Sequence, residues 1–109
     1  MRILSLVKIV PTVENRKEVL DILNSMKGPT QAIHGCLACD ICVEEGDEGV
    51  IIFLEQWRTW EDFIRHVRSD LYARMLEAME LSSKEPEVSF FEVTAMKGME
   101  LIEAVRNPK

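Results

Sequence analysis

One short segment in the middle of the chain carries a carboxylate, indole rings and an imidazole, groups that together could hold an aromatic ligand and move a proton. Glu55 and Trp57 are separated by one residue in an apolar stretch typical of a strand, so both side chains are expected on the same strand face. His66 follows in a stretch with helical spacing. Because imidazole titrates near neutral pH, His66 is a candidate general base.

Aromatic side chains gather around these groups. The strand face predicted by period two consists of Phe53, Glu55 and Trp57. The helix side predicted by spacings of three and four consists of Trp60, Phe63, Ile64 and Val67, with His66 at its edge. If the strand and the helix pack together, they enclose an aromatic-walled space that Glu55 and His66 can approach. Pockets for flat, apolar ligands have this composition.

Each of these residues also has a purely structural interpretation. Trp57 and Trp60 could be core residues, and His66 could be an exposed or hydrogen-bonded helix histidine. Tyr72 lies on an apolar helical stripe, which favours core packing, although its hydroxyl could also hold a ligand. The second histidine, His34, precedes a glycine in a loop and is expected at the surface.

Glu55 is the least ordinary member of the group, because a carboxylate buried in an apolar strand needs a partner. Its structural interpretation is an ion pair or hydrogen bond with a nearby helix, for which Arg58 and Arg65 are the predicted partners. The alternative is a role in chemistry, and the residue pattern alone leaves both open.

The three cysteines follow the spacing C-x-x-C-x-x-C, which is typical of metal and redox motifs. The segment around them, however, is rich in strand formers. In a regular strand, Cys36 and Cys42 would share one face about 20 Å apart and Cys39 would point to the other. We therefore expect buried, inert thiols and no metal, and a metal or redox site would require residues 36–42 to be a loop.

The remaining pattern predicts alternating strands and helices. Pro11 ends the first strand, Thr12 caps the first helix, and Lys27-Gly28-Pro29 ends that helix. Residues 45–49 form a hairpin turn, and Ser69 divides the later helical stretch in two. The predicted strands are 2–10, 36–45, 50–57 and 88–95, and the predicted helices are 12–26, two within 60–81, and 99–106.

This order, β-α-β-β-α-β, is the ferredoxin-like arrangement of an α+β protein with an antiparallel sheet. We expect a single domain over residues 1–109, with 98–109 as a C-terminal helical extension. Residues 50–54 and 88–93 are largely apolar on both strand faces. An antiparallel sheet with one wet face would alternate instead, so the face away from the helices is expected to be covered. We predict a homodimer with the two sheets face to face.

Composition excludes several classes of protein. The chain has 109 residues, of which 47% are hydrophobic and 29% are charged, as in a soluble globular domain. The net charge of −6 and the scattered basic residues argue against nucleic-acid binding. No apolar stretch approaches the ~18 residues of a membrane span, and no signal-peptide core is present. We expect a cytoplasmic protein without membrane or nucleic-acid partners.

A longer pattern joins the residues described above. It consists of Glu55-Gln56-Trp57, His66 nine positions after Trp57, Arg68-Ser69 before an apolar helix, Gly35-Cys36 at the second strand, and Pro86-Glu87-Val88 at the last strand. This pattern resembles the antibiotic biosynthesis monooxygenase domain over residues 3–94. The resemblance implies a ferredoxin-like chain that pairs into a dimeric α+β barrel, with a pocket between sheet and helices in each subunit.

The resemblance also implies an activity. Characterised enzymes of that family oxidise hydroquinones, quinols or polycyclic phenols with molecular oxygen, without metal, flavin or haem. By this resemblance the chain is a cofactor-independent monooxygenase of a small phenolic substrate. The implied catalytic residues are His66, as base, and Glu55, which orients or polarises. The implied substrate-binding residues are Trp57, Phe53, Trp60, Phe63 and Tyr72.

Two other functions remain as alternatives. Related dimeric barrels bind an apolar small molecule as sensors or carriers without turnover. A haem-degrading branch of the same fold uses an asparagine on the first strand together with a tryptophan and a histidine. Residues 2–10 contain no asparagine, which disfavours the haem reaction.

Overall fold

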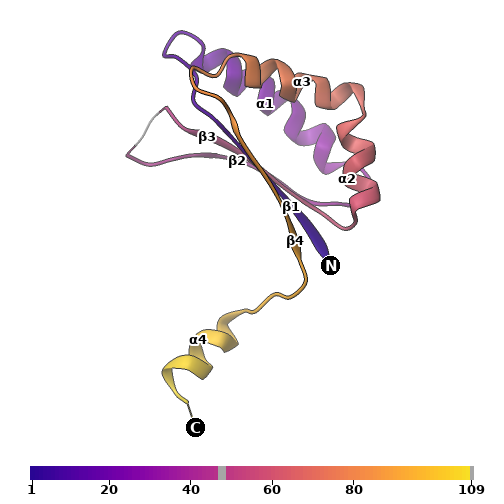
Figure 1. The fold of residues 1–109 in the computed structure, drawn as a ribbon, viewed down its shortest axis with the longest axis vertical. Helices are drawn as coiled ribbons and strands as arrows, with labels where there is room; N and C mark the ends of the chain where they lie inside the picture. Colours follow the sequence, from indigo (N-terminus) through magenta and orange to yellow (C-terminus); the bar gives the residue numbers. More distant parts are fainter. Residues whose placement is uncertain (47–48, 109) are drawn as a thin grey trace.

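A computed structural model describes residues 1–46 and 49–108 of the chain (Figure 1). Part of the predicted turn at 45–49 therefore lies outside the described residues. In chain order the elements are β1 (Arg2–Ile9), α1 (Arg16–Gln31), β2 (Cys36–Val43), β3 (Ile51–Trp57), α2 (Trp60–Val67), α3 (Asp70–Glu80), β4 (Glu87–Val93) and α4 (Met99–Arg106). The predicted α+β class and ferredoxin-like order are confirmed.

The strands form one four-stranded antiparallel sheet in the order β2-β3-β1-β4. Helices α1, α2 and α3 lie together on one side of it (Figure 1). We call this side the covered face and the other the open face. Ile3, Ser5, Val7 and Ile9 of β1 are at most 1% exposed on the covered face, while the residues that alternate with them are half-buried. The alternation follows from period two in a strand with one packed side.

The first helix differs from its prediction at both ends. Thr12 closes a short turn by accepting from the backbone N–H of Asn15, and the helix begins only at Arg16. At the other end, the helix continues through Gly28 and Pro29 to Gln31. Gly28 has no Cβ to clash with the proline ring, and the carbonyl group that the proline leaves unbonded belongs to an exposed turn. Packing of the last turn outweighs the local stop signal.

The division of residues 60–81 into two helices is confirmed. The Thr59 hydroxyl accepts from the backbone N–H of Asp62 and caps α2. The Ser69 hydroxyl accepts from the backbone N–H of Tyr72 and caps α3. These two caps fix where each helix begins, and so they set the positions of the side chains that α2 and α3 project toward the sheet.

The core lies between the covered face and the helices in two parts. The larger part joins β1, β2 and β3 to α1 and α3, and a smaller part of Ile3, Trp57 and Phe63 lies beneath α2. In the described part of the chain, no helix covers β4 in the same way, and Val88 and Phe90 on that strand are 42% and 47% exposed.

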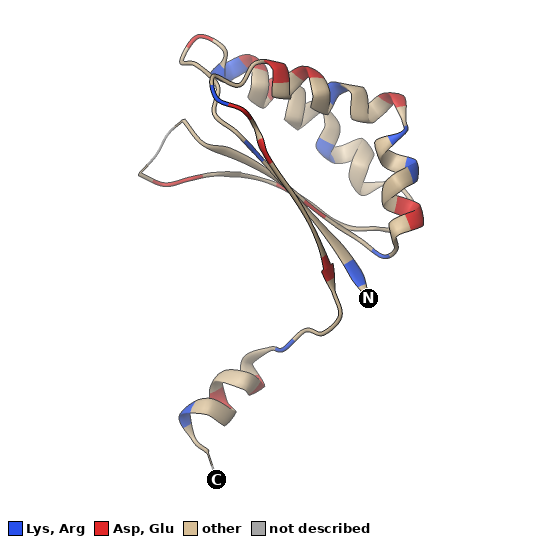
Figure 2. Ribbon diagram, viewed as in Figure 1, with Lys and Arg blue, Asp and Glu red and all other residues tan. Residues whose placement is uncertain are grey.

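Charged residues lie mainly on the helices, loops and strand ends, and the middle of the sheet is largely uncharged (Figure 2). Basic residues are spread over several elements in this view, as expected from their spacing in the sequence. Among the described residues, no helix combines the length and apolar content needed to cross a bilayer.

Candidate functional site

Glu55 lies in the middle of β3 with its side chain on the covered face and only 1% of its surface exposed. Its neighbours across the sheet are Ser5 on β1 and Cys39 on β2, both also buried. One carboxylate oxygen accepts a 2.7 Å hydrogen bond from the indole Nε1 of Trp57, two residues further along the same strand face. The predicted common face is confirmed, and it supplies one partner that a buried carboxylate needs.

The other carboxylate oxygen of Glu55 faces His66. His66 Nε2 lies 3.6 Å from Glu55 Oε2, and both side chains are almost completely buried. Neither ring nitrogen of His66 has a hydrogen-bond partner among the described residues. This is unusual, since buried polar atoms are nearly always bonded. The imidazole therefore has hydrogen-bonding capacity that the described protein groups do not use.

Two aromatic rings hold the imidazole in place. The Trp57 ring stacks on it with centroids 4.8 Å apart and an interplanar angle of 29°. Tyr72, in the first turn of α3, meets it edge-on at 5.3 Å and 87°. We call Glu55, Trp57, His66 and Tyr72 the buried cluster. It brings together one carboxylate, one imidazole and two aromatic side chains from β3, α2 and α3.

Burial shifts the acidity of the groups beside Glu55. Desolvation, with a smaller contribution from the nearby Glu55 carboxylate, raises the pKa of the Tyr72 hydroxyl to about 12. The same two causes raise the pKa of the Cys39 thiol to about 12. Both groups therefore stay protonated at neutral pH, so neither a tyrosinate nor a Cys39 thiolate is available as a nucleophile or base.

A close contact between Gly35, just before β2, and the start of α2 sets the position of His66. Gly35 has φ +91°, and a Cβ at this position would overlap the side chain of Asp62 in the first turn of α2. The Gly35 carbonyl also accepts from the backbone N–H of Arg58, just after β3. Glycine is therefore required here for both conformation and space. This approach holds the start of α2 against the sheet, one turn before His66.

A second aromatic group extends the site toward β4. Phe63 is 3% exposed and lies 5.2 Å from the ring of Phe90 and 6.2 Å from the ring of Trp60. The Trp60 indole donates to the carboxylate of Glu92 on β4. We call Trp60, Phe63 and Phe90 the aromatic rim. It is more exposed than the buried cluster because none of the described helices lies over β4.

Phe90, the rim residue on β4, was not among the predicted site residues. Phe90 pairs with Ser5 across the β1–β4 ladder, which puts it on the covered face. The period-two spacing of Val88, Phe90 and Glu92 in the sequence is the pattern that could have identified Phe90 as a site residue. It can be used only once the position of β4 beside β1 is known.

Several predicted positions are corrected. Ile64 and Val67 were predicted on the side of α2 that packs against the sheet, but they are 42% and 40% exposed. The residues that α2 turns toward the sheet are Asp62, Phe63 and His66. The predicted arginine partners of Glu55 are also wrong. Arg65 pairs with Asp62 at 3.2 Å, and Arg58 is exposed after β3.

All seven predicted site residues lie on the covered side of the sheet, but they are divided among the buried cluster, the aromatic rim and the larger core. Phe53 is 1% exposed and packs in the larger core. Trp60 is half-buried in the rim. His34 is exposed, as predicted.

The cysteines lie on a strand, as predicted, but their faces differ from the prediction. A bulge between Cys36 and Ala38 shifts the register, so Cys36 pairs with Trp57 and Cys39 pairs with Glu55. Cys36 and Cys39 therefore share the covered face, and Cys42 is exposed rather than buried. Within residues 1–46 and 49–108, no three acidic, cysteine or histidine residues are grouped as metal ligands.

Comparison with known proteins places this geometry in context. The model of the family described as antibiotic biosynthesis monooxygenase matches residues 3–78, which includes the whole buried cluster. A search of the curated proteins gave no match.

Solved structures share the fold. Rv0793 from Mycobacterium tuberculosis has a TM-score of 0.81 at 20% identity, over 90% of this chain and 100% of that one. A conserved protein from Methanosarcina mazei Go1 has a TM-score of 0.79 at 22% identity, over 84% and 92%. A structure described as antibiotic biosynthesis monooxygenase has a TM-score of 0.76 at 17% identity, over 85% and 99%. At these identities the likeness shows the fold alone.

Proposed function

Because the chain belongs to the antibiotic biosynthesis monooxygenase family, we propose that it oxidises a small phenol or quinol with molecular oxygen in the cytoplasm, with His66 as the proton acceptor. One observation carries this proposal. His66 is buried beside a carboxylate and between aromatic rings, with neither ring nitrogen hydrogen-bonded to a described residue. A phenolic hydroxyl is a group of the right polarity for that imidazole, and its ring suits the surrounding aromatic side chains.

The proposed reaction uses the substrate itself as the reductant. His66 removes the phenolic proton, and the electron-rich anion passes one electron to oxygen, giving a substrate radical and superoxide. The two recombine to form a carbon–oxygen bond. Protonation of the resulting peroxide and loss of water leave one oxygen atom in the product as a carbonyl. The two hydrogen atoms of the water come from the substrate, so atoms and electrons balance without a redox group on the protein.

Glu55 would stabilise the charge that forms on His66. An imidazolium at this position would lie 3.6 Å from the Glu55 carboxylate, where opposite charges attract strongly because water is excluded. The hydrogen bond from Trp57 holds the carboxylate in that orientation. Trp57 also stacks on the imidazole, so one side chain positions both members of the pair.

The aromatic rim is the proposed route of the substrate. Phe90 is 47% exposed, whereas Phe63, directly beside it, is 3% exposed. A flat ring could lie against Phe90 and reach the buried cluster when Phe63 turns aside. Trp60 and Glu92 would border this route on the side of α2.

We also propose that two copies pair through the open faces of their sheets. The centre of this face consists of half-buried or exposed apolar side chains, namely Leu4, Leu6, Ile52, Leu54 and Phe91. Its ends are polar, with Lys8 opposite Glu87 at one end and Arg2 and Gln56 near the other. An apolar centre with a polar border is the usual composition of a protein interface.

The test is oxygen uptake by metal-stripped protein with a panel of hydroquinones and polycyclic phenols. The wild type should consume oxygen above the uncatalysed rate, and His66→Ala should lose about 100-fold of that rate, the low end of the contribution of a general base. His34→Ala is the matched control, because it removes the exposed histidine of the same chain and should leave the rate unchanged.

Two results would contradict the proposal. One is equal oxygen uptake by the wild type and His66→Ala, which would remove the proposed base. The other is binding of a panel compound, seen as quenching of tryptophan fluorescence, without oxygen uptake by the wild type. That result would favour the alternative function, a barrel that binds an apolar molecule as a sensor or carrier.

A further inference from the structure

The C-terminal helix α4 makes an apolar stripe that nothing in the described chain covers. Leu101, Ile102 and Val105 are 48%, 53% and 69% exposed, and none of the residues of α4 is buried. Their positions lie on one side of the helix, and Glu100, Glu103 and Ala104 lie on the other. An isolated helix of eight residues is too short to be stable in water, so the stripe indicates a missing packing partner.

The position of α4 relative to the sheet indicates which surface could pack against its apolar stripe. Figure 1 shows α4 away from the rest of the chain, on the side of the sheet opposite to α1, α2 and α3. The long axis of the molecule is 55 Å because of this projection. The helix is therefore on the same side as the apolar open face.

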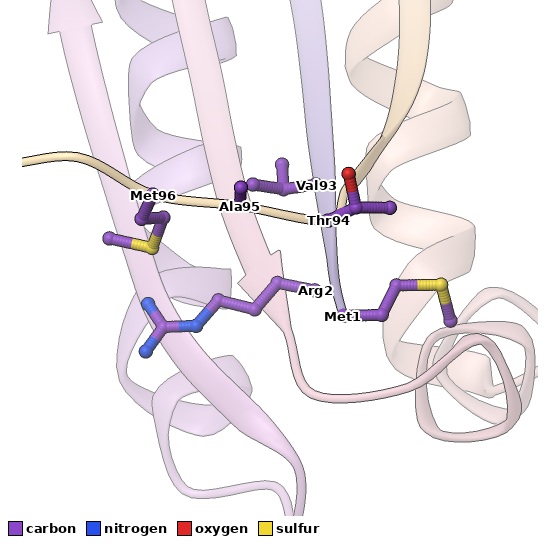
Figure 3. Close-up of a pocket in the computed structure, with 6 residues that line it drawn as sticks. All are labelled: Met1, Arg2, Val93, Thr94, Ala95 and Met96. Carbon is purple, nitrogen blue, oxygen red and sulfur yellow. The ribbon is translucent and has the colours of Figure 1, made fainter.

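The segment between β4 and α4 begins at one end of that open face. Residues 94–98 leave the sheet at the end of β4, where Arg2 and Val93 are paired on the open face. There Thr94, Ala95 and Met96 border a pocket of about 190 Å³ (Figure 3). Arg2 and Met96 lie on the same side of the pocket in this view. Met96 is 65% exposed, so the linker between the open face and α4 also carries an exposed apolar side chain.

We infer that α4 is an arm that packs its apolar stripe against a second copy of this chain, and this inference rests on the proposed pairing of the open faces. A two-fold axis that brings one open face onto another also brings each α4 beside the body of the other copy, because α4 projects on that side. The sheet contact and the two arms then form one continuous interface.

Folding of α4 back onto its own sheet is the competing arrangement. It would cover the same apolar centre that a second copy needs, so it predicts a monomer. The two arrangements therefore differ in oligomeric state as well as in which chain the arm touches.

The experiment measures dimerisation of the full-length chain by sedimentation across protein concentrations. Ile102→Glu puts a charge in the stripe and should raise the dimer dissociation constant at least tenfold. Ala104→Glu is the matched control, since it adds the same charge on the opposite side of the same helix, and should change that constant less than twofold. Because both positions are exposed, both variants should keep the thermal unfolding of the wild type at protein concentrations where the wild type is unpaired.

A photoreactive side chain at Val105 identifies which chain the arm touches. Cross-linked dimers are expected, and cross-links found only within one chain would overturn the inference. An unchanged dissociation constant in Ile102→Glu would also overturn it, while leaving the sheet pairing in place. A wild type that is monomeric at every concentration would overturn both the arm and the pairing. Oxygen uptake is a separate readout, so none of these results is confused with failure of the proposed reaction.

Discussion

The two faces of the sheet are built from neighbouring residues of the same strands but differ in what they bury. On the covered face of β3, Phe53, Glu55 and Trp57 are each at most 1% exposed. On the open face of that strand, Ile52 and Leu54 are only half-buried. The covered face buries the carboxylate of Glu55 against His66 of α2, whereas the centre of the open face is largely apolar, with Ser89 and Asp40 on the two edge strands.

This difference shows that the burial of polar groups, rather than apolar content, distinguishes the candidate site. Burying Glu55 and His66 costs free energy, which the surrounding fold must offset. A face that only needed to pack would use apolar residues there, as the open face does. The covered face therefore carries groups suited to chemistry, and the open face carries groups suited to association.

The largest expected effect comes from shortening neighbouring residues on opposite faces of β3. Phe53→Ala should lower the free energy of unfolding by about 3–5 kcal/mol, because it leaves a cavity in the larger core. Leu54→Ala should cost no more than about 1–2 kcal/mol at low protein concentration, since its side chain is only half-buried in one chain. Urea unfolding of both variants at several protein concentrations measures the difference.

Protein concentration separates packing from association in this pair. The loss in Leu54→Ala should grow as the concentration rises through the range in which the wild type pairs, because the variant loses interface as well as packing. The loss in Phe53→Ala should stay constant. Equal, concentration-independent losses in the two variants would mean that the two faces do not differ in function as argued above.

The next expected effect is on the pH dependence of folding stability, and it tests the covered side of the sheet alone. Burial raises the pKa of Tyr72 to about 12, above the ordinary value of 10. Above pH 10 the unfolded chain therefore loses this proton while the folded chain keeps it, so stability is full below pH 10 and falls toward pH 12. Between pH 7.5 and 11, Tyr72→Phe should lose about 1 kcal/mol less stability than the wild type.

Denaturant unfolding at the two pH values measures this difference. The Cys39 thiol has its pKa raised in the same way and remains in both proteins, so its contribution cancels in the comparison. An identical loss of stability in the wild type and Tyr72→Phe would show that the hydroxyl is in contact with water, and that the buried cluster is more open than its packing indicates.

Much of this organisation could be predicted from the sequence because it depends on local spacing. Period two placed Phe53, Glu55 and Trp57 on one face, and Ser69 marked the division between α2 and α3. The two apolar faces of β4 and the helical spacing of α4 were also visible in the sequence. These features need only the geometry of one element at a time.

What could not be predicted depends on contacts between distant residues. The buried side of α2 is set by the approach of Gly35 to Asp62, which exposes Ile64 and Val67. The bulge at Cys36 moves that thiol to the covered face. The extension of α1 through Pro29 depends on the packing of its last turn. In each case a tertiary contact outweighs a local preference.

The smallest expected effect comes from β4, where side chains on both faces of the sheet are exposed. Phe90 and Phe91 are adjacent on β4, with 47% and 48% of their surfaces exposed, but Phe90 lies on the covered face and Phe91 on the open face. Because neither is deeply buried, shortening either to alanine should change the free energy of unfolding of one chain only slightly.

Phe90→Ala should therefore raise the KM for a phenolic substrate several-fold, by about the 0.5–1.5 kcal/mol of one aromatic contact, and leave dimerisation unchanged. Phe91→Ala should weaken dimerisation by a similar factor and leave KM unchanged when the protein is kept concentrated enough to pair. Oxygen-uptake kinetics and sedimentation on the same two preparations give both readouts. If Phe91→Ala raised KM as much as Phe90→Ala did in fully paired protein, the substrate route would not be confined to the covered face. Because the two residues match in type, exposure and strand, the face on which each side chain lies is the only difference that could produce opposite results.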